Sequence, residues 1–426
     1  MFKKLFAIAC IAVAVWACTD TNDVSLVTPE VDDAQQETLL TGTRTEAEAR
    51  ACAIDAFARF YGASRSLTLI KDVKCVTSKS ESRSEGSDTL YYVVNTEGDA
   101  GYAVIAADRA HTPVLAVTEC GNIEDVENVE NPGAEIFFDA LSDYHAIRED
   151  LEKIDSMSII KPIYPVDRFN EYRTVTSSSE RIAGPYAPFA WGQGFPENYH
   201  FPNQIAGCGN IASLLIMSHF EEPKTYNANN RLINVDWSVI KQHSKSSGFY
   251  SDECGLGLSA RPHKALADLC WAVAERNKSM YEAQGTATTI SNVNEMFKDC
   301  VPNLYVGDVR DGFPGTLPDN SDMMYYVRAT ADPEGGHAFV IDGKLTVTCS
   351  TTTAVRVKGT DFWNVVSSES VTILYSHINW GWNGHDNGYF YDQPFKVSEG
   401  YRYDDEHYDG GPKFLTNYRY FAVGAR

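Results

Sequence analysis

The stretch at positions 335–343 reads Gly-Gly-His-Ala-Phe-Val-Ile-Asp-Gly, and its apolar run predicts a strand that opens at His337. A second stretch, Ala-Gly-Cys-Gly-Asn-Ile-Ala at 206–212, predicts a helix start, because apolar residues at helical spacing follow Cys208. A helix start lowers the pKa of a thiol, since its unpaired N–H groups carry partial positive charge. His337 follows Cys208 by roughly 130 residues, an order and separation expected for a thiol nucleophile and a base that meet only in the fold.

A third stretch, Tyr-Ser-His-Ile-Asn-Trp-Gly-Trp-Asn-Gly at 375–384, predicts a strand that runs into a turn. Asn379 can accept a hydrogen bond from an imidazole and fix its tautomer, and Trp380 can cover that bond. Cys, His and Asn in this order follow the triad logic of thiol proteases. The alternative for Cys208 alone is a buried core thiol. The flanking Gly207 and Gly209 predict open space around the sulfur instead.

These three stretches resemble the streptopain family of papain-clan cysteine peptidases, and the resemblance covers residues 182–426. It implies that Cys208 is the nucleophile and His337 the general base and acid, with Asn379 and Trp380 supporting the His. Gln193, in Trp-Gly-Gln-Gly at 191–194, matches an element that precedes the family's nucleophile. Its side-chain amide is therefore expected to be the second donor of an oxyanion hole.

His377 is the alternative base, because it lies two residues before Asn379 and shares a strand face with it. His337 is preferred, since it carries the matched motif. Three departures from the family bear on pocket shape and substrate preference. Positions 209–212 read Gly-Asn-Ile-Ala, where the family has Val-Ala-Thr-Ala. Residues 344–372 replace a short turn, and 327–330 read Val-Arg-Ala-Thr, without the polar Gln that the family can offer.

The N-terminus predicts export. Lys3 and Lys4 precede an apolar run at 5–16, which ends at Ala17 and Cys18. Such a pattern is typical of a signal peptide and is too short for a comfortable membrane span. Cys18 directly after Val-Trp-Ala resembles a bacterial lipobox, so we expect residues 1–17 to be removed and Cys18 to carry lipid. The alternative is an ordinary secretory signal that is cut nearby.

The composition of the chain limits the kinds of molecule that it can bind. The chain has 426 residues and a net charge of −22, which argues against a nucleic acid partner and allows two domains. Of the ten cysteines, Cys10 would leave with the signal peptide. Apart from Cys18 and Cys208, an odd number of cysteines then remains, so they cannot all pair with one another. One or two disulfides are compatible with the sequence. These remaining cysteines are at 52, 75, 120, 254, 270, 300 and 349. No Cys-x-x-Cys spacing suggests zinc, and we predict neither a metal nor a cofactor.

A separate unit precedes the catalytic motifs. Residues 18–44 are polar and acidic and predict a flexible tether. Residues 45–165 carry no catalytic pattern, and the resemblance implies an inhibitory pro-domain there. Residues 166–181 predict an exposed linker in which processing occurs. The pattern of this unit predicts helices at 44–60 and 134–154 and strands at 67–76, 90–96, 102–107 and 114–118.

The fold class expected for residues 182–426 is α+β, a papain-like two-lobed domain with a helical lobe and an antiparallel sheet. Helical patterns follow Cys208 and recur at 265–276 and 291–298, and strands dominate after Met323. The sequence therefore predicts a cysteine endopeptidase made as a zymogen and anchored by lipid in the bacterial cell envelope. Its partners would be protein and peptide substrates, its own pro-domain and the membrane. The sequence does not decide whether the enzyme is released after processing, or whether it faces the periplasm or the cell surface.

Two other functions remain open from the sequence. A papain-clan acyl transferase would need the same Cys and His and would pass the acyl group to an amine. A catalytically silent binding lipoprotein of the same fold would be expected to have lost Cys208, His337 or Asn379, and all three are intact.

Overall fold

A computed structural model of the chain describes residues 42–62, 69–77, 89–109, 112–155, 170–228, 231–244, 257–319, 322–331, 335–397 and 416–426. The signal peptide 1–17, Cys18 and the tether up to residue 41 lie outside these ranges. The chain divides into two compact units. The first comprises Met1–Val117, Ile147–Ile182 and Leu345–Leu374, and the second comprises Thr118–Ala146, Ala183–Lys344 and Tyr375–Arg426.

The first unit contains a helix and an antiparallel meander. Helix α3 (Glu46–Tyr61) begins with a capping box, in which the Thr45 hydroxyl and the Glu48 carboxylate each accept the other's backbone N–H. The four strands that the sequence predicts are present, and they pair in chain order. They are β1 (Ile70–Thr77), β2 (Thr89–Thr96), β3 (Tyr102–Ala106) and β4 (Val114–Thr118), with the short η3 (Glu97–Asp99) after β2. The apolar face of α3, with Phe57 fully buried, packs on β3.

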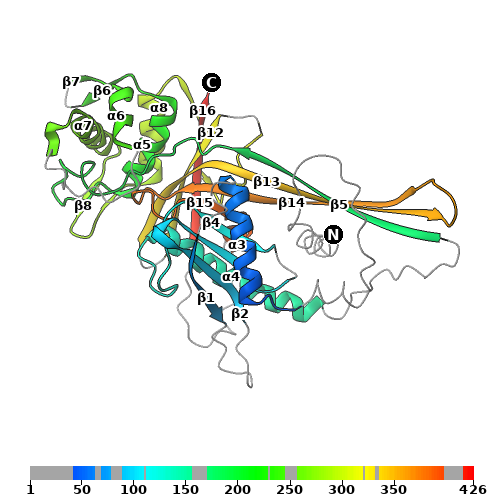
Figure 1. Ribbon diagram of the computed structural model, residues 1–426. Helices are drawn as coiled ribbons and strands as arrows, with labels where there is room; N and C mark the ends of the chain where they lie inside the picture. The colour runs from blue at the N-terminus through cyan, green and yellow to red at the C-terminus, as the bar shows by residue number, and fades with distance from the viewer. Residues whose placement is uncertain are drawn as a thin grey trace. The chain divides into compact units, whose positions relative to one another are not determined.

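Two strands, β13 (Gly335–Val357) and β14 (Asn364–Asn379), are unusually long (Figure 1). Each has part of its residues in the first unit and part in the second. Their turn contains Gly359 at φ 87°, where glycine is favoured, and the Thr360 N–H donates to the Val357 carbonyl over 3.0 Å. Phe362 beside this turn is 83% exposed. The segment 344–372 is therefore an extended pair of strands in place of a short turn.

Strand β5 (Asn170–Ala183) pairs with β13 and differs from the expected linker at 166–181. Residues 177–182 are exposed, in agreement with the expectation, but they are hydrogen-bonded as a strand rather than free. Sequence alone misses this strand because Ser177, Ser178 and Ser179 give it no apolar alternation.

The second unit contains a sheet that holds both the His and the Asn segments. Its strand order is β15-β14-β13-β12-β16-β10. The further strands are β10 (Leu304–Val306), β11 (Arg310–Asp311), β12 (Met323–Ala331), β15 (Gly388–Tyr391) and β16 (Thr416–Ala425). The pairs β12–β13, β12–β16 and β14–β15 are antiparallel. In the register of β12 and β13, Ala329 lies opposite His337.

A helical layer forms the other lobe of this unit (Figure 1). It contains α5 (Cys208–Phe220), α6 (Trp237–Ile240), α7 (Arg261–Arg276) and α8 (Ile290–Cys300). The hairpins β6–β7 (Thr225–Ala228 and Arg231–Asn234) and β8–β9 (Met280–Glu282 and Gly285–Ala287) accompany it, with η4 (Lys241–Ser244) and η6 (Gly257–Ser259). Leu214 and Leu215 of α5 share one buried core with Tyr326 and Val340 of the sheet. This arrangement of helical lobe and antiparallel sheet is the α+β, papain-like fold that the sequence predicts.

Two further helices complete the described elements. Helix α4 (Pro132–Asp155) lies in the predicted pro-domain, and α9 (Asp392–Val397) follows β15. The seven cysteines in the described ranges are free thiols. Of the helices within those ranges, none combines the length and the apolar character that a membrane crossing requires.

Candidate active site

Cys208 is the first residue of α5, as the sequence predicts. The cap residue Gly207 has φ 88°, a conformation that favours glycine, and a side chain there would lie 2.5 Å from the Thr286 carbonyl oxygen. A side chain at Gly209 would overlap the Thr288 methyl group. The expectation of open space beside the sulfur is therefore wrong. These glycines allow the 286–288 segment to approach the helix start closely.

The imidazole of His337 is hydrogen-bonded to the Cys208 sulfur, which also accepts the backbone N–H of Ala338. Burial raises the pKa of the Cys208 thiol, but the charge and hydrogen bond of His337, with smaller effects of the Ala338 N–H and the Arg328 charge, together bring the pKa down to about 7. Burial lowers the pKa of His337, whereas the charge and hydrogen bond of Cys208 raise it, and the net shift is upward. Each partner thus favours the charged form of the other, which is the condition for a thiolate–imidazolium pair.

The second ring nitrogen of His337 binds a backbone group. His337 Nε2 lies 2.8 Å from the carbonyl oxygen of Trp380, so Nε2 carries the proton that it donates. Nδ1 is then the nitrogen left for Cys208. A backbone carbonyl on a buried turn fixes both the tautomer and the direction of the ring.

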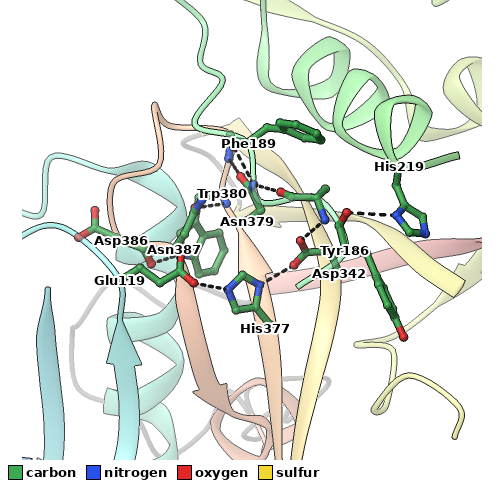
Figure 2. A network of polar contacts seen from close by, with 12 residues as sticks. Glu119, Tyr186, Phe189, His219, Asp342, His377, Asn379, Trp380, Asp386 and Asn387 are labelled. Atoms are coloured by element: carbon green, nitrogen blue, oxygen red, sulfur yellow. Dashed lines mark hydrogen bonds and ion pairs between the residues drawn. The ribbon is translucent and has the colours of Figure 1, made fainter. Parts of the chain in front are cut away.

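Asn379 is buried beside this turn, but its side chain binds other groups (Figure 2). Its Nδ2 donates to the carbonyls of Ala187 and Phe189, each over 3.0 Å, and its Oδ1 accepts the Gly381 N–H over 3.0 Å. In this structure the hydrogen-bond partner of His337 is therefore the Trp380 carbonyl rather than the expected Asn379 amide. Asn379 instead links the segment at 187–189 by hydrogen bonds to the turn that contains the Trp380 carbonyl.

The side chain of Trp380 is fully buried. Its ring lies 4.7 Å from the Phe339 ring, and its Nε1–H donates to the Asp386 carbonyl over 3.0 Å. Its backbone N–H donates to Asn387 Oδ1 over 2.9 Å. These contacts hold the Trp380 carbonyl in place for His337.

Gln193 lies on the loop before α5 and is partly exposed. Its carbonyl accepts the Ala206 N–H over 3.0 Å, which ties this loop to the residues just ahead of Cys208. The neighbouring Trp191 carbonyl accepts the Asn383 N–H over 3.1 Å. The loop is thus held close to the thiol and to the Trp380 turn, while the part of the Gln193 amide in an oxyanion hole stays a prediction.

His377 occupies a different place from His337. It is buried, with Nδ1 2.5 Å from Asp342 Oδ1 and Nε2 3.5 Å from Glu119 Oε1 (Figure 2). Burial lowers the pKa of His377, but the Asp342 and Glu119 carboxylates outweigh it and raise the pKa to about 10. A protonated imidazole between two carboxylates cannot act as the base, so the geometry favours His337 over this alternative.

The unit with the active site also contains Thr118–Ala146, which belongs to the predicted pro-domain. The Asn131 side-chain amide donates to Asp386 Oδ2 over 2.9 Å, and the Glu119 N–H donates to the Asn387 carbonyl over 2.8 Å. A side chain at Gly133 would lie 2.5 Å from the Trp380 ring. This segment therefore packs on the turn whose carbonyl holds His337, a contact that the sequence pattern alone does not indicate.

A partly buried thiol at a helix start, paired with an imidazole between a helical lobe and an antiparallel sheet, is the arrangement expected of a thiol peptidase of the papain-like class. Comparisons with known proteins agree with that class. Residues 191–390 match the peptidase C10 family, and residues 43–144 match the Spi protease inhibitor family. Residues 191–390 thus carry a peptidase C10 domain, which is streptopain-like and supports a cysteine-type peptidase, and an inhibitor-type propeptide domain at 43–144 precedes it.

One curated relative is similar over a longer range. It is the thiol protease/hemagglutinin PrtT of Porphyromonas gingivalis, with 24% identity over 337 residues, or 72% of this chain. The aligned region is 34% of that relative, so the chain spans about a third of its length. The name of this relative agrees with thiol peptidase chemistry.

Proposed function

We propose that this chain is an exported cysteine endopeptidase that is made latent and hydrolyses peptide bonds through Cys208 and His337. The observation that carries the proposal is the hydrogen-bonded thiol–imidazole pair, with the thiol pKa near 7. A substantial fraction of the thiol is then present as thiolate at neutral pH.

The reaction follows from the positions of the groups. The Cys208 thiolate attacks the peptide carbonyl carbon, and negative charge develops on the carbonyl oxygen. The backbone N–H at the start of α5 and the Gln193 amide stabilise that oxyanion. The His337 imidazolium gives its proton to the departing amine and then takes one from the water that hydrolyses the thioester. Throughout, Nε2 of His337 stays bound to the Trp380 carbonyl, which keeps the ring aligned.

Mass spectrometry of the full-length chain incubated with casein tests this proposal. Wild type should generate casein peptides and a trimmed form of itself, whereas Cys208→Ala should generate neither. Adding an amine separates hydrolysis from acyl transfer, because a transferase would yield amide products in proportion to the amine. Intact casein with wild type under reducing conditions would reject the peptidase proposal and favour a silent binding protein.

Latency is the second part of the proposal. The contacts from Glu119, Asn131 and Gly133 to the Trp380 turn support a role of the inhibitor-type domain as an intramolecular inhibitor, since they bear on the group that orients His337. Trimming near 161–182 would release these contacts. Full-length Cys208→Ala should stay intact alone and be trimmed there by added active enzyme.

Location is the third part. The lipobox-like sequence ending at Cys18 supports a lipid anchor in the bacterial envelope, with the polar tether giving reach toward substrates. Metabolic labelling with a palmitate analogue should tag wild type and leave Cys18→Ser untagged. Soluble, untagged wild type would instead favour an ordinary secretory signal at 1–17.

A further inference from the structure

A cation lies beside the reacting pair, and the mechanism above does not use it. Arg328 is in the middle of β12, directly opposite Ala338 of β13. Ala338 follows His337, and its N–H donates to the Cys208 sulfur. Opposed residues on neighbouring strands are about 5 Å apart, so the Arg328 backbone lies one strand spacing from the residue whose N–H binds the sulfur. Its charge reaches the pair, since it contributes to the lowered pKa of Cys208 and offsets part of the rise in the pKa of His337.

One hydrogen bond anchors the guanidinium. Arg328 Nη1 donates to the Thr288 carbonyl over 2.8 Å. Thr288 is the residue whose methyl group packs against Gly209, next to the nucleophile. Arg328 is half-buried, so it is held on the wall beside Cys208 while part of its side chain still meets solvent. A guanidinium has five N–H donors in a planar fork, and this backbone contact takes only one of its nitrogens.

The strand on the other side offers a direct comparison. Arg419 of β16 lies opposite Arg328, and its Nε pairs with Asp311 Oδ1 over 3.1 Å. Among the residues that the structure describes, no carboxylate lies within 4.0 Å of the Arg328 guanidinium. Two arginines thus sit side by side, and within the described ranges only the one farther from the thiol has an acidic partner.

We propose that Arg328 is a specificity-determining residue that binds the carboxylate of an Asp or Glu side chain of the peptide substrate near the scissile bond. The proposal rests on the peptidase function proposed above. A planar guanidinium matches a carboxylate with two parallel N–H···O bonds, and such charge-assisted pairs exceed neutral hydrogen bonds in strength. The acidic substrate side chain would therefore supply the partner that Asp311 supplies to Arg419.

The test uses matched peptides and the full-length chain after its own processing. Each peptide set places Glu, its neutral isostere Gln, or Lys at one position on either side of the scissile bond. The ratio of kcat/KM for Glu over Gln is measured within each variant, so a change in thiol pKa cancels. Wild type should prefer Glu by about tenfold at one position. Arg328→Gln should bring that ratio to about one, and Arg328→Glu should favour Lys at the same position.

Arg419→Gln is the matched control, because it removes the neighbouring arginine on the same sheet and should keep the Glu preference. Labelling of Cys208 by a thiol-directed inhibitor reports whether each variant keeps a folded site. Cleavage with no acidic preference at any position, or a preference that survives Arg328→Gln, would overturn the proposal. Arg328 would then have only a structural role, through its hydrogen bond to the Thr288 carbonyl. Absence of cleavage for every peptide would instead count against the peptidase function itself.

Discussion

At the scale of single residues, burial and charge act on Cys208 in opposite directions. Burial alone would hold the thiol protonated and unreactive. The His337 imidazole, the Ala338 N–H and the Arg328 charge together reverse that effect and leave the thiol pKa near 7. The reactivity of the sulfur therefore depends on these neighbours.

Removal of either reacting group should abolish catalysis. We expect Cys208→Ala to lower kcat/KM by several orders of magnitude with folding intact, and His337→Ala to be nearly as damaging. Peptide hydrolysis and active-site labelling measure both variants, and His377→Ala distinguishes the two histidines. A fatal His377→Ala beside a harmless His337→Ala would show that the base is assigned to the wrong residue.

The pH dependence of the thiol should report the pair directly. With a pKa near 7, the alkylation rate of Cys208 by iodoacetamide should rise as pH increases through about 7. In His337→Ala, burial remains and the main opposing cause is gone, so the rise should move to well above pH 8. Mass spectrometry of the peptide that contains Cys208 separates its alkylation from that of other thiols. Identical profiles in both proteins would contradict the pairing.

Asn379 should act on His337 indirectly. Asn379→Ala removes the amide that binds the Ala187 and Phe189 carbonyls and the oxygen that holds the Gly381 N–H. The Ala187 carbonyl keeps the Phe189 N–H as a partner, so the Phe189 carbonyl and the Gly381 N–H lose a bond without this compensation. Leaving a buried polar group unpaired costs about 1–3 kcal/mol, so we expect a clear loss of stability. The loss of kcat/KM should be smaller than in Cys208→Ala. Thermal unfolding and kinetics measure the two effects, and a loss of activity at unchanged stability would point to direct contact with His337 in the working enzyme.

The sequence allows prediction of the reacting residues for a physical reason. The thiol and the imidazole each need a local context, a helix start and a strand start, and both contexts are readable from short motifs. The partners of Asn379 are not readable in this way, because Ala187 and Phe189 come from a distant segment that only the fold brings near. The surroundings of Gly207 and Gly209 are not readable either, since Thr286 and Thr288 come from a distant segment and fill the space beside these glycines.

At the scale of elements, β13 and β14 are joined by a buried ion pair. His377 of β14 pairs with Asp342 of β13, and Glu119 and Tyr389 also face the imidazole. Removing one partner of a buried charge pair leaves the other uncompensated. We expect Asp342→Asn to lower the free energy of unfolding by about 3–5 kcal/mol, as measured by denaturant titration. A loss below about 1 kcal/mol would mean that the pair contributes little to stability.

The same pair sets a pH dependence of stability. The pKa of His377 is about 10 in the native protein against 6.5 ordinarily, so the native state binds this proton more tightly than the unfolded chain. The resulting stabilisation is complete below about pH 6.5 and is lost as pH rises toward 10. Unfolding free energies at pH 6.5, 8 and 10 should therefore fall, and the fall should be shallower in His377→Gln. Parallel slopes for both proteins would contradict a protonated His377.

Most elements are predictable because each buries a periodic apolar face. Helix α3 at Glu46–Tyr61 and helix α5 at Cys208–Phe220 begin close to where their patterns begin. Strand β5 could not be predicted, since its polar residues show no alternation and its partner β13 lies far along the chain. The continuation of β13 and β14 past the motifs could not be predicted for a similar reason, because Ser- and Thr-rich stretches carry little periodic signal.

At the scale of the whole molecule, the proposed latency would depend on a few contacts of the inhibitor-type domain. Gly133 lies against the Trp380 ring, where a side chain would come within 2.5 Å of ring carbon atoms. Asn131 holds the same turn through Asp386 and the His385 carbonyl. Both residues belong to the segment that matches the inhibitor family, so processing would remove them from the mature enzyme.

Gly133→Ala should therefore weaken latency without harming the processed enzyme. The added methyl group forces either the helix start or the Trp380 ring to move, which loosens the segment from the turn. We expect full-length Gly133→Ala to process itself several-fold faster than wild type, as followed by mass spectrometry over time. After complete trimming, both proteins should have the same kcat/KM, because the substituted residue has left. Gly315→Ala is the matched control, since nothing lies within 4 Å of a side chain at that glycine. Equal processing rates for Gly133→Ala and Gly315→Ala, or full activity of uncleaved wild type, would show that this segment does not restrain the site.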